Sequence, residues 1–80
     1  MAAIQQAITF KNSGTLTLST TGCHIYVYDT TDSTPGLEVV KIVNGAAPRS
    51  FPVATGRNYD VLVAGTTDVQ LSGVIHYSFA

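Results

Sequence analysis

The side chains able to do acid–base or nucleophilic chemistry are few in this chain of 80 residues. It contains none of the G-x-S-x-G, Walker, G-x-G-x-x-G or paired-cysteine motifs that mark common catalytic and phosphate-binding sites. Its five carboxylates fall mainly at expected turns or strand ends, where aspartate normally bonds the local backbone; they are Asp29, Asp32, Glu38, Asp60 and Asp68. The sequence therefore predicts a protein that is not an enzyme, with no catalytic residue and no cofactor.

The groups that could bind a metal do not form a complete site. Cys23 and His24 are adjacent, so on a strand their side chains point to opposite faces and cannot act as a pair. His24 and His76 have matching parity, but two histidines do not complete a tetrahedral zinc site. The segment from Asp29 to Ser33 has too few carboxylates for a calcium loop. We expect no metal site, and a buried, inert thiol at Cys23.

The amino-acid composition excludes several classes of binding partner. Only 11% of the residues are charged, against about 25% in an average protein, and the net charge is −1. Four basic residues give no electrostatic footprint for nucleic acid or for a membrane surface. Residues 1–80 form one domain, whose small core leaves it marginally stable unless a partner helps.

Alternation of apolar and polar residues with a period of two runs along the chain and predicts strands, not helices. Turn-forming residues separate the expected strands, and Asn44-Gly45 is the strongest hairpin signal because both residues tolerate positive φ. The expected strands are Ala3–Phe10, Thr15–Thr20, Cys23–Tyr28, Leu37–Val43, Arg49–Val53, Tyr59–Ala64 and Val69–Phe79. Seven short strands without helices predict an all-β antiparallel sandwich.

One segment carries a family resemblance. The run Val53-Ala-Thr-Gly-Arg-Asn-Tyr59-Asp-Val61-Leu-Val63-Ala is similar to the E to F region of fibronectin-III and immunoglobulin-like domains. The resemblance implies a seven-stranded immunoglobulin-like or fibronectin-III-like sandwich, with the hydroxyl of Tyr59 bonded backward to a backbone group. It also implies that the third, sixth and seventh strands share one sheet.

With that arrangement, one outer face would be unusually apolar and aromatic. Antiparallel sheets normally present a polar face to solvent, so such a surface predicts contact with another protein. The predicted protein-binding residues are His24, Tyr26, Tyr28, Leu62, Val74 and His76. The alternative is that the tyrosines only cover a solvated sheet. The strand Leu37–Val43 is apolar on both faces and is a second candidate surface.

These features favour a structural role. We expect a subunit of a bacteriophage virion, as a head-decoration or tail component, because small immunoglobulin-like domains are typical of such accessory proteins. The expected partner is a capsid or other virion protein, with self-association into a homo-oligomer or lattice; the protein would be assembled in the host cytoplasm and located in the virion. Two alternatives stay open: a carbohydrate-binding module that stacks sugars on Tyr26 and Tyr28, and an inhibitor of a host or bacterial protein.

Overall fold

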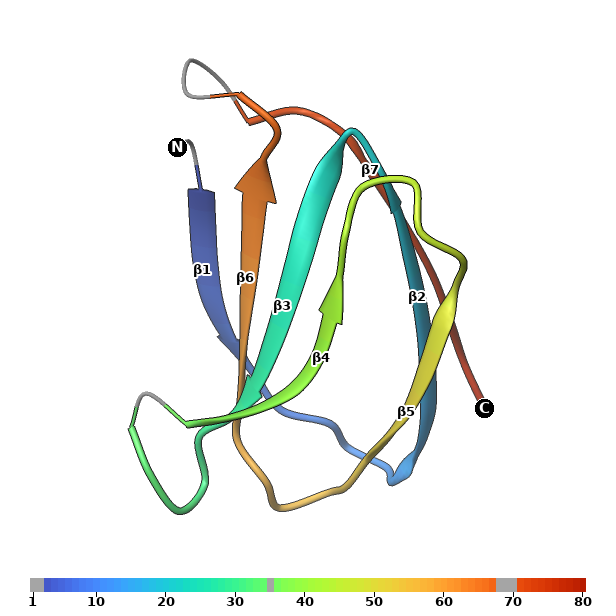
Figure 1. Ribbon diagram of the computed structural model, residues 1–80. Helices are drawn as coiled ribbons and strands as arrows, with labels where there is room; N and C mark the ends of the chain where they lie inside the picture. The colour runs from blue at the N-terminus through green and yellow to red at the C-terminus, as the bar shows by residue number, and fades with distance from the viewer. Residues whose placement is uncertain (1–2, 35, 68–70) are drawn as a thin grey trace.

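The computed structural model describes residues 3–34, 36–67 and 71–80, and these residues form seven strands and no helix. The strands make two antiparallel sheets, one of order β1-β6-β3-β4 and one of order β5-β2-β7 (Figure 1). Their bounds are β1 Ala3–Ile8, β2 Gly14–Thr21, β3 Cys23–Asp29, β4 Leu37–Ile42, β5 Arg49–Val53, β6 Tyr59–Gly65 and β7 Val74–Phe79. The expected all-β architecture is confirmed. No helix in the described ranges is long and apolar enough to cross a membrane.

The core lies between the two sheets, where β2 and β3 supply its centre. Alternate residues of these strands are buried, because side chains along a strand point to opposite faces. Gly22 connects the two strands with φ of 84°, a conformation that L side chains rarely adopt. The buried hydrophobic cluster consists of Leu16, Leu18, Ile25, Val27, Val40, Ile42, Phe51, Val53 and Tyr59.

The sandwich is held together along its β4 and β5 side by the segment that connects these strands. Gly45 donates its backbone N–H to the carbonyl of Thr20 at 3.3 Å, and the Asn44 side chain accepts the N–H of Gly22 at 2.7 Å. The prediction of a hairpin at Asn44-Gly45 is wrong, because β4 and β5 belong to different sheets. Gly45 has φ of 80°, whereas the described non-glycine residues, Asn44 among them, have no positive φ.

The position of the last strand also differs from the expectation. Strand β6 pairs with β3 on one side and with β1 on the other, and β7 pairs with β2 in the second sheet. The connection from Gly65 to Val74 is longer than the two to five residues typical of a hairpin, so it can cross between the sheets. Strand β7 begins only after Gly73, whose φ is 138°. Residues 69 and 70 of the expected strand Val69–Phe79 lie outside the described residues.

The backward hydrogen bond predicted for Tyr59 is present. Its hydroxyl accepts the backbone N–H of Ala54 at 3.0 Å, and its ring meets that of Phe10 edge to face at 5.6 Å. Tyr59 is 3% exposed, so this bond fixes the turn between β5 and β6 from inside the core. Of the three strands that the resemblance placed in one sheet, β3 and β6 are neighbours and β7 lies in the other sheet. The described residues form a two-sheet, all-β sandwich of seven strands.

Candidate docking surfaces

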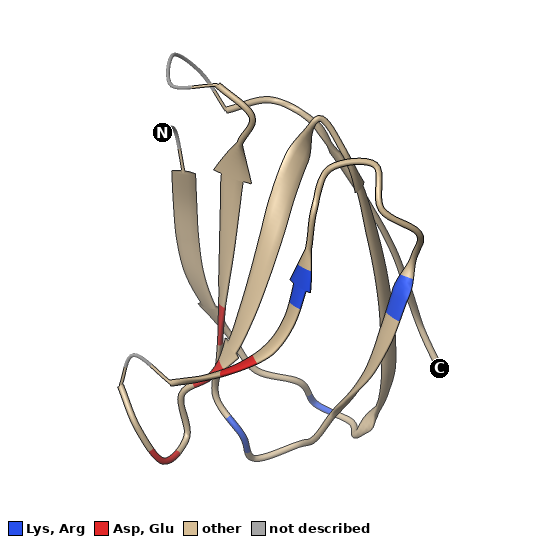
Figure 2. Ribbon diagram, in the orientation of Figure 1, with Lys and Arg blue, Asp and Glu red and all other residues tan. Residues whose placement is uncertain are grey.

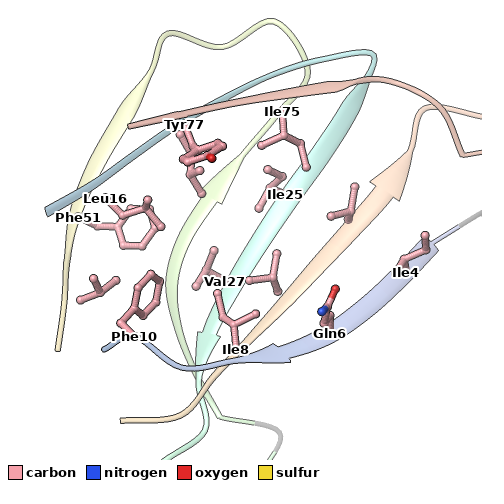
Figure 3. A pocket seen from close by; sticks show the side chains of 14 residues that line it. Ile4, Gln6, Ile8, Phe10, Leu16, Ile25, Val27, Phe51, Ile75 and Tyr77 are labelled. Atoms are coloured by element: carbon pink, nitrogen blue, oxygen red, sulfur yellow. The ribbon is translucent and has the colours of Figure 1, made fainter. Parts of the chain in front are cut away.

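The sandwich has an apolar cleft of about 540 Å³ between its sheets. Figure 3 shows it between β1 and β7, with Ile4, Gln6 and Ile8 on one rim and Ile75 and Tyr77 on the other. The remaining lining comes from the core, namely Phe10, Leu16, Leu18, Ile25, Val27, Phe51, Val53, Val61 and Val63. A hollow of about 340 Å³ shares part of this lining and continues beneath residues 71–73.

Residues that face the cleft remain open to solvent. Tyr77 lines the cleft and is nevertheless 76% exposed, and Ile4 on the opposite rim is 57% exposed. Val61 and Val63 face inward from a central strand but are only half-buried. Because inward residues of a closed sandwich are normally covered, the β1 and β7 side of this core is uncovered in the single chain.

The two strands that border the cleft are both sheet edges. Among the described residues, β1 pairs only with β6 and β7 only with β2, so each has one edge without a strand partner. Eleven of their twelve residues are exposed. Such an edge presents free N–H and C=O groups that can pair with another strand.

The other two edge strands carry features that prevent such pairing. Strand β4 contains Glu38 and Lys41, and the β3–β4 ladder shifts register between Val27 and Tyr28. Strand β5 contains Arg49 and Pro52. Charges, prolines and bulges are the means by which natural proteins block edges, and β1 and β7 contain no Lys, Arg, Asp, Glu or Pro (Figure 2).

The total surface agrees with an uncovered side. The chain exposes 4997 Å², whereas a compact monomer of 8.4 kDa is expected to expose about 4,600 Å². The excess is close to half of the roughly 800 Å² that each partner buries in an interface of standard size. Among the described residues, seven large hydrophobic residues are exposed, and five of them lie on β1 or β7: Ile4, Val74, Ile75, Tyr77 and Phe79.

The six residues predicted to bind protein do not share one face. Strands β3 and β6 bring His24, Tyr26, Tyr28 and Leu62 together on the outer face of the four-stranded sheet. Val74 and His76 lie on β7 in the other sheet, so their placement beside the tyrosines was wrong. Their expected outward direction fits the structure, because the alternate residues Ile75 and Tyr77 line the cleft.

The four residues that do assemble form a half-buried aromatic patch with a polar border. Gln5, Leu62, Tyr26 and Lys41 form one row across the four strands. The Lys41 ammonium lies 5.7 Å from the centroid of the Tyr26 ring. A central aromatic region with a polar rim is the usual anatomy of a protein interface. We name His24, Tyr26, Tyr28 and Leu62 the outer patch.

A charged cluster lies at one end of the sandwich. Arg57 donates to Asp29 at 2.6 Å and to Asp32 at 3.1 Å, and the N–H of Thr31 donates to Asp29 at 3.0 Å. The hydrogen bond from Arg57 and those from Thr31 lower the pKa of Asp29 from 3.8 to about 2. This cluster links the loop after β3 to the loop before β6, and its carboxylates are occupied by these contacts.

Two further titratable groups, His24 and Cys23, take part in local structure. The Nδ1 of His24 accepts the backbone N–H of Asn44 at 3.0 Å, which ties the outer patch to the turn after β4. Cys23 is 2% exposed, and burial raises the pKa of its thiol. In the described ranges, no three His, Cys, Asp or Glu side chains gather as they would around a metal, and no buried side-chain nitrogen or oxygen lacks a hydrogen-bond partner.

Comparison with protein-family models, curated proteins and solved structures finds no match to this chain.

Sequence reasoning missed four of the residues that border the cleft, namely Ile4, Gln6, Ile8 and Tyr77. The signal was present in the distribution of charge. The first and last strands contain no Lys, Arg, Asp or Glu, while the expected strands from 37 to 43 and from 49 to 53 contain them. This comparison requires knowing which strands lie at the sheet edges, and the resemblance predicted the wrong sheet for β7.

Proposed function

We propose that this protein is a non-catalytic structural subunit of a larger protein assembly, in which protein covers the side between β1 and β7. The observation that carries the proposal is the contrast between sheet edges. The edges of β4 and β5 are blocked by charges, a proline and a register shift, and the apolar edges of β1 and β7 are left free beside an open core. A subunit of an assembly can pair the free edges of β1 and β7 with a neighbouring protein. A chain that works alone would leave these edges exposed to aggregation.

The outer patch is the proposed contact with the shell of the assembly. Tyr26 and Tyr28 offer large contact area with a polar tip and lose little side-chain entropy when they bind. Lys41 lies over one face of the Tyr26 ring, so that face is less open to stacking with a sugar. That contact favours a protein partner over carbohydrate.

A bacteriophage virion is the assembly that we propose, with the chain as a head-decoration or tail component. The support is its small size, its content of 11% charged residues, and a fold that presents free strand edges on one side. Many identical copies in a lattice need more than one contact surface each. The cleft side and the outer patch lie on different parts of this sandwich.

Density-gradient fractionation of particles from the native host tests this function. We expect the chain to co-sediment with virus particles and to stay with them through washing in high salt, because its surface contacts are largely uncharged. Recovery only in the fraction of free protein, at every stage of an infection, would contradict the proposal.

A further inference from the structure

We propose that two copies of this chain close each other's cleft, with β1 paired to β1 and β7 paired to β7 of the second copy. The proposal deepens the function above and rests on it for its biological setting. It names the partner at the open side as a second copy of the same chain. A single twofold axis that passes near Gln6 on β1 and through β7 across the cleft would generate both pairings.

The strand directions allow one symmetry operation to extend both sheets. Strand β1 is antiparallel to β6, which is antiparallel to β3, so β1 runs in the direction of β3. Strand β7 is antiparallel to β2, which the turn at Gly22 joins to β3, so β7 runs the same way (Figure 1). A twofold axis perpendicular to the sheets reverses both strands and makes both new pairs antiparallel.

The inward residues of the two edges fit this symmetry. Strand β1 places Ile4, Gln6 and Ile8 toward the cleft. Centring the pair on Gln6 sets Ile4 of each copy opposite Ile8 of the other and keeps all three residues inside, because the register preserves parity. On β7 a centre at an inward residue such as Ile75 or Tyr77 keeps the cleft-lining side chains inside for the same reason.

Gln6 is the residue that favours a second copy over an unrelated strand. Around it the cleft is lined mainly by apolar side chains, and covering an amide without a partner is costly. On a twofold axis the amide meets its own counterpart, and an amide carries both donors and an acceptor, so the two satisfy each other. An apolar strand from another protein would leave the amide of Gln6 unsatisfied.

The charge distribution also fits self-pairing. The partner must offer an uncharged edge of about six residues with alternate apolar side chains, and β1 and β7 are themselves such edges. Two free edges on one side double the contact that a single added strand could make. The inward apolar side chains of β1 and β7 in each copy would also cover the open cleft of the other copy.

Charge exchange at residue 6 tests the arrangement directly. Wild-type protein is examined by sedimentation equilibrium beside Gln6→Glu and Gln6→Lys, with Asn12→Asp as the matched control in an exposed loop. We expect wild type and Asn12→Asp at twice the chain mass of 8.4 kDa, and each Gln6 variant alone at the chain mass, because like charges would meet on the axis. Gln6 is exposed in the single chain, so both variants should fold, and circular dichroism checks that they do.

Mixing the variants provides the decisive step. Affinity-tagged Gln6→Glu should retain untagged Gln6→Lys and should not retain untagged Gln6→Glu, since only a twofold contact sets residue 6 against itself. If wild-type protein is monomeric at about 100 µM, its dissociation constant exceeds that concentration and the proposed pairing is overturned. Dimers formed by each Gln6 variant alone, or a wild-type monomer carrying a bound apolar molecule in native mass spectrometry, would also overturn it.

The failure of this proposal is distinguishable from the failure of the proposed function. A monomeric chain that still co-sediments with virus particles removes the pairing and leaves the structural role. A dimer that never associates with particles removes the structural role and leaves the pairing.

Discussion

Replacing Tyr59 by phenylalanine isolates the bond that fixes the turn between β5 and β6. The hydroxyl of Tyr59 accepts the N–H of Ala54 at 3.0 Å in a partly buried setting, and the ring is 3% exposed. Phenylalanine keeps the ring and its edge-to-face contact with Phe10, so the change removes one hydrogen bond. The expected loss in the free energy of unfolding is about 1 kcal/mol, the usual net value of one such bond.

Urea denaturation at fixed protein concentration measures this loss, since association would otherwise contribute to apparent stability. In a domain of this size, about 1 kcal/mol corresponds to a fall of roughly 4–8 °C in Tm. Tyr59→Ala should cost about 3 to 5 kcal/mol, because it also opens a cavity in the core. Tyr28→Phe is the matched control, because its half-buried hydroxyl makes no hydrogen bond within the described residues. Equal stability of Tyr59→Phe and Tyr28→Phe would refute the reasoning.

Three further changes test other parts of the structure. The pKa of Asp29 is about 2 in the folded chain against a usual 3.8, so the stability that Asp29 contributes is present above about pH 4 and is lost as pH falls toward 2. Arg57→Met should flatten this part of an acid-unfolding curve. An unchanged curve would show that the contact with Arg57 does not lower the pKa of Asp29. Tyr26→Asp should leave a folded domain that no longer binds particles, while Thr17→Asp on the other sheet should still bind, as co-sedimentation would show; equal binding would place the contact elsewhere. Cys23→Ser should lower the Tm, because it buries a hydroxyl where the thiol was 2% exposed, and any thiol-dependent turnover lost with it would contradict a non-catalytic role.

Much of the fold follows from local pattern. Alternation located six strands to within two residues at each end, because one face of each strand must be buried and a shift by one residue would expose it. The seventh strand was predicted to begin five residues before Val74, where it begins in the structure. The backward bond of Tyr59 was implied by the resemblance, and it is also local, since donor and acceptor lie five residues apart in the chain. Such features depend on neighbours in sequence, and the sequence specifies them directly.

The arrangement of the strands depends on distant contacts and was predicted less well. Alternation along the last strand predicted that Val74 and His76 point outward. No feature of the neighbouring sequence indicates which strand pairs with β7. The resemblance placed the seventh strand in one sheet with the third and sixth, whereas β1 lies beside β6 and β7 lies beside β2. The cleft exists only because β1 and β7 border it from different sheets, so it could not be found before the strand order was known.

Hydrogen exchange along the two free edges is the most direct test of the claim that protein covers the β1 and β7 side. In the assembled protein we expect the amides of Ala3–Ile8 and Val74–Phe79 to be protected on both edges of each strand, because a second strand would take up the bonds that one chain leaves open. In the Gln6→Glu variant, the amides that point away from β6 and β2 should exchange quickly. Equally rapid exchange at those amides in the assembled wild-type protein, with protection appearing at β4 and β5 instead, would contradict the account.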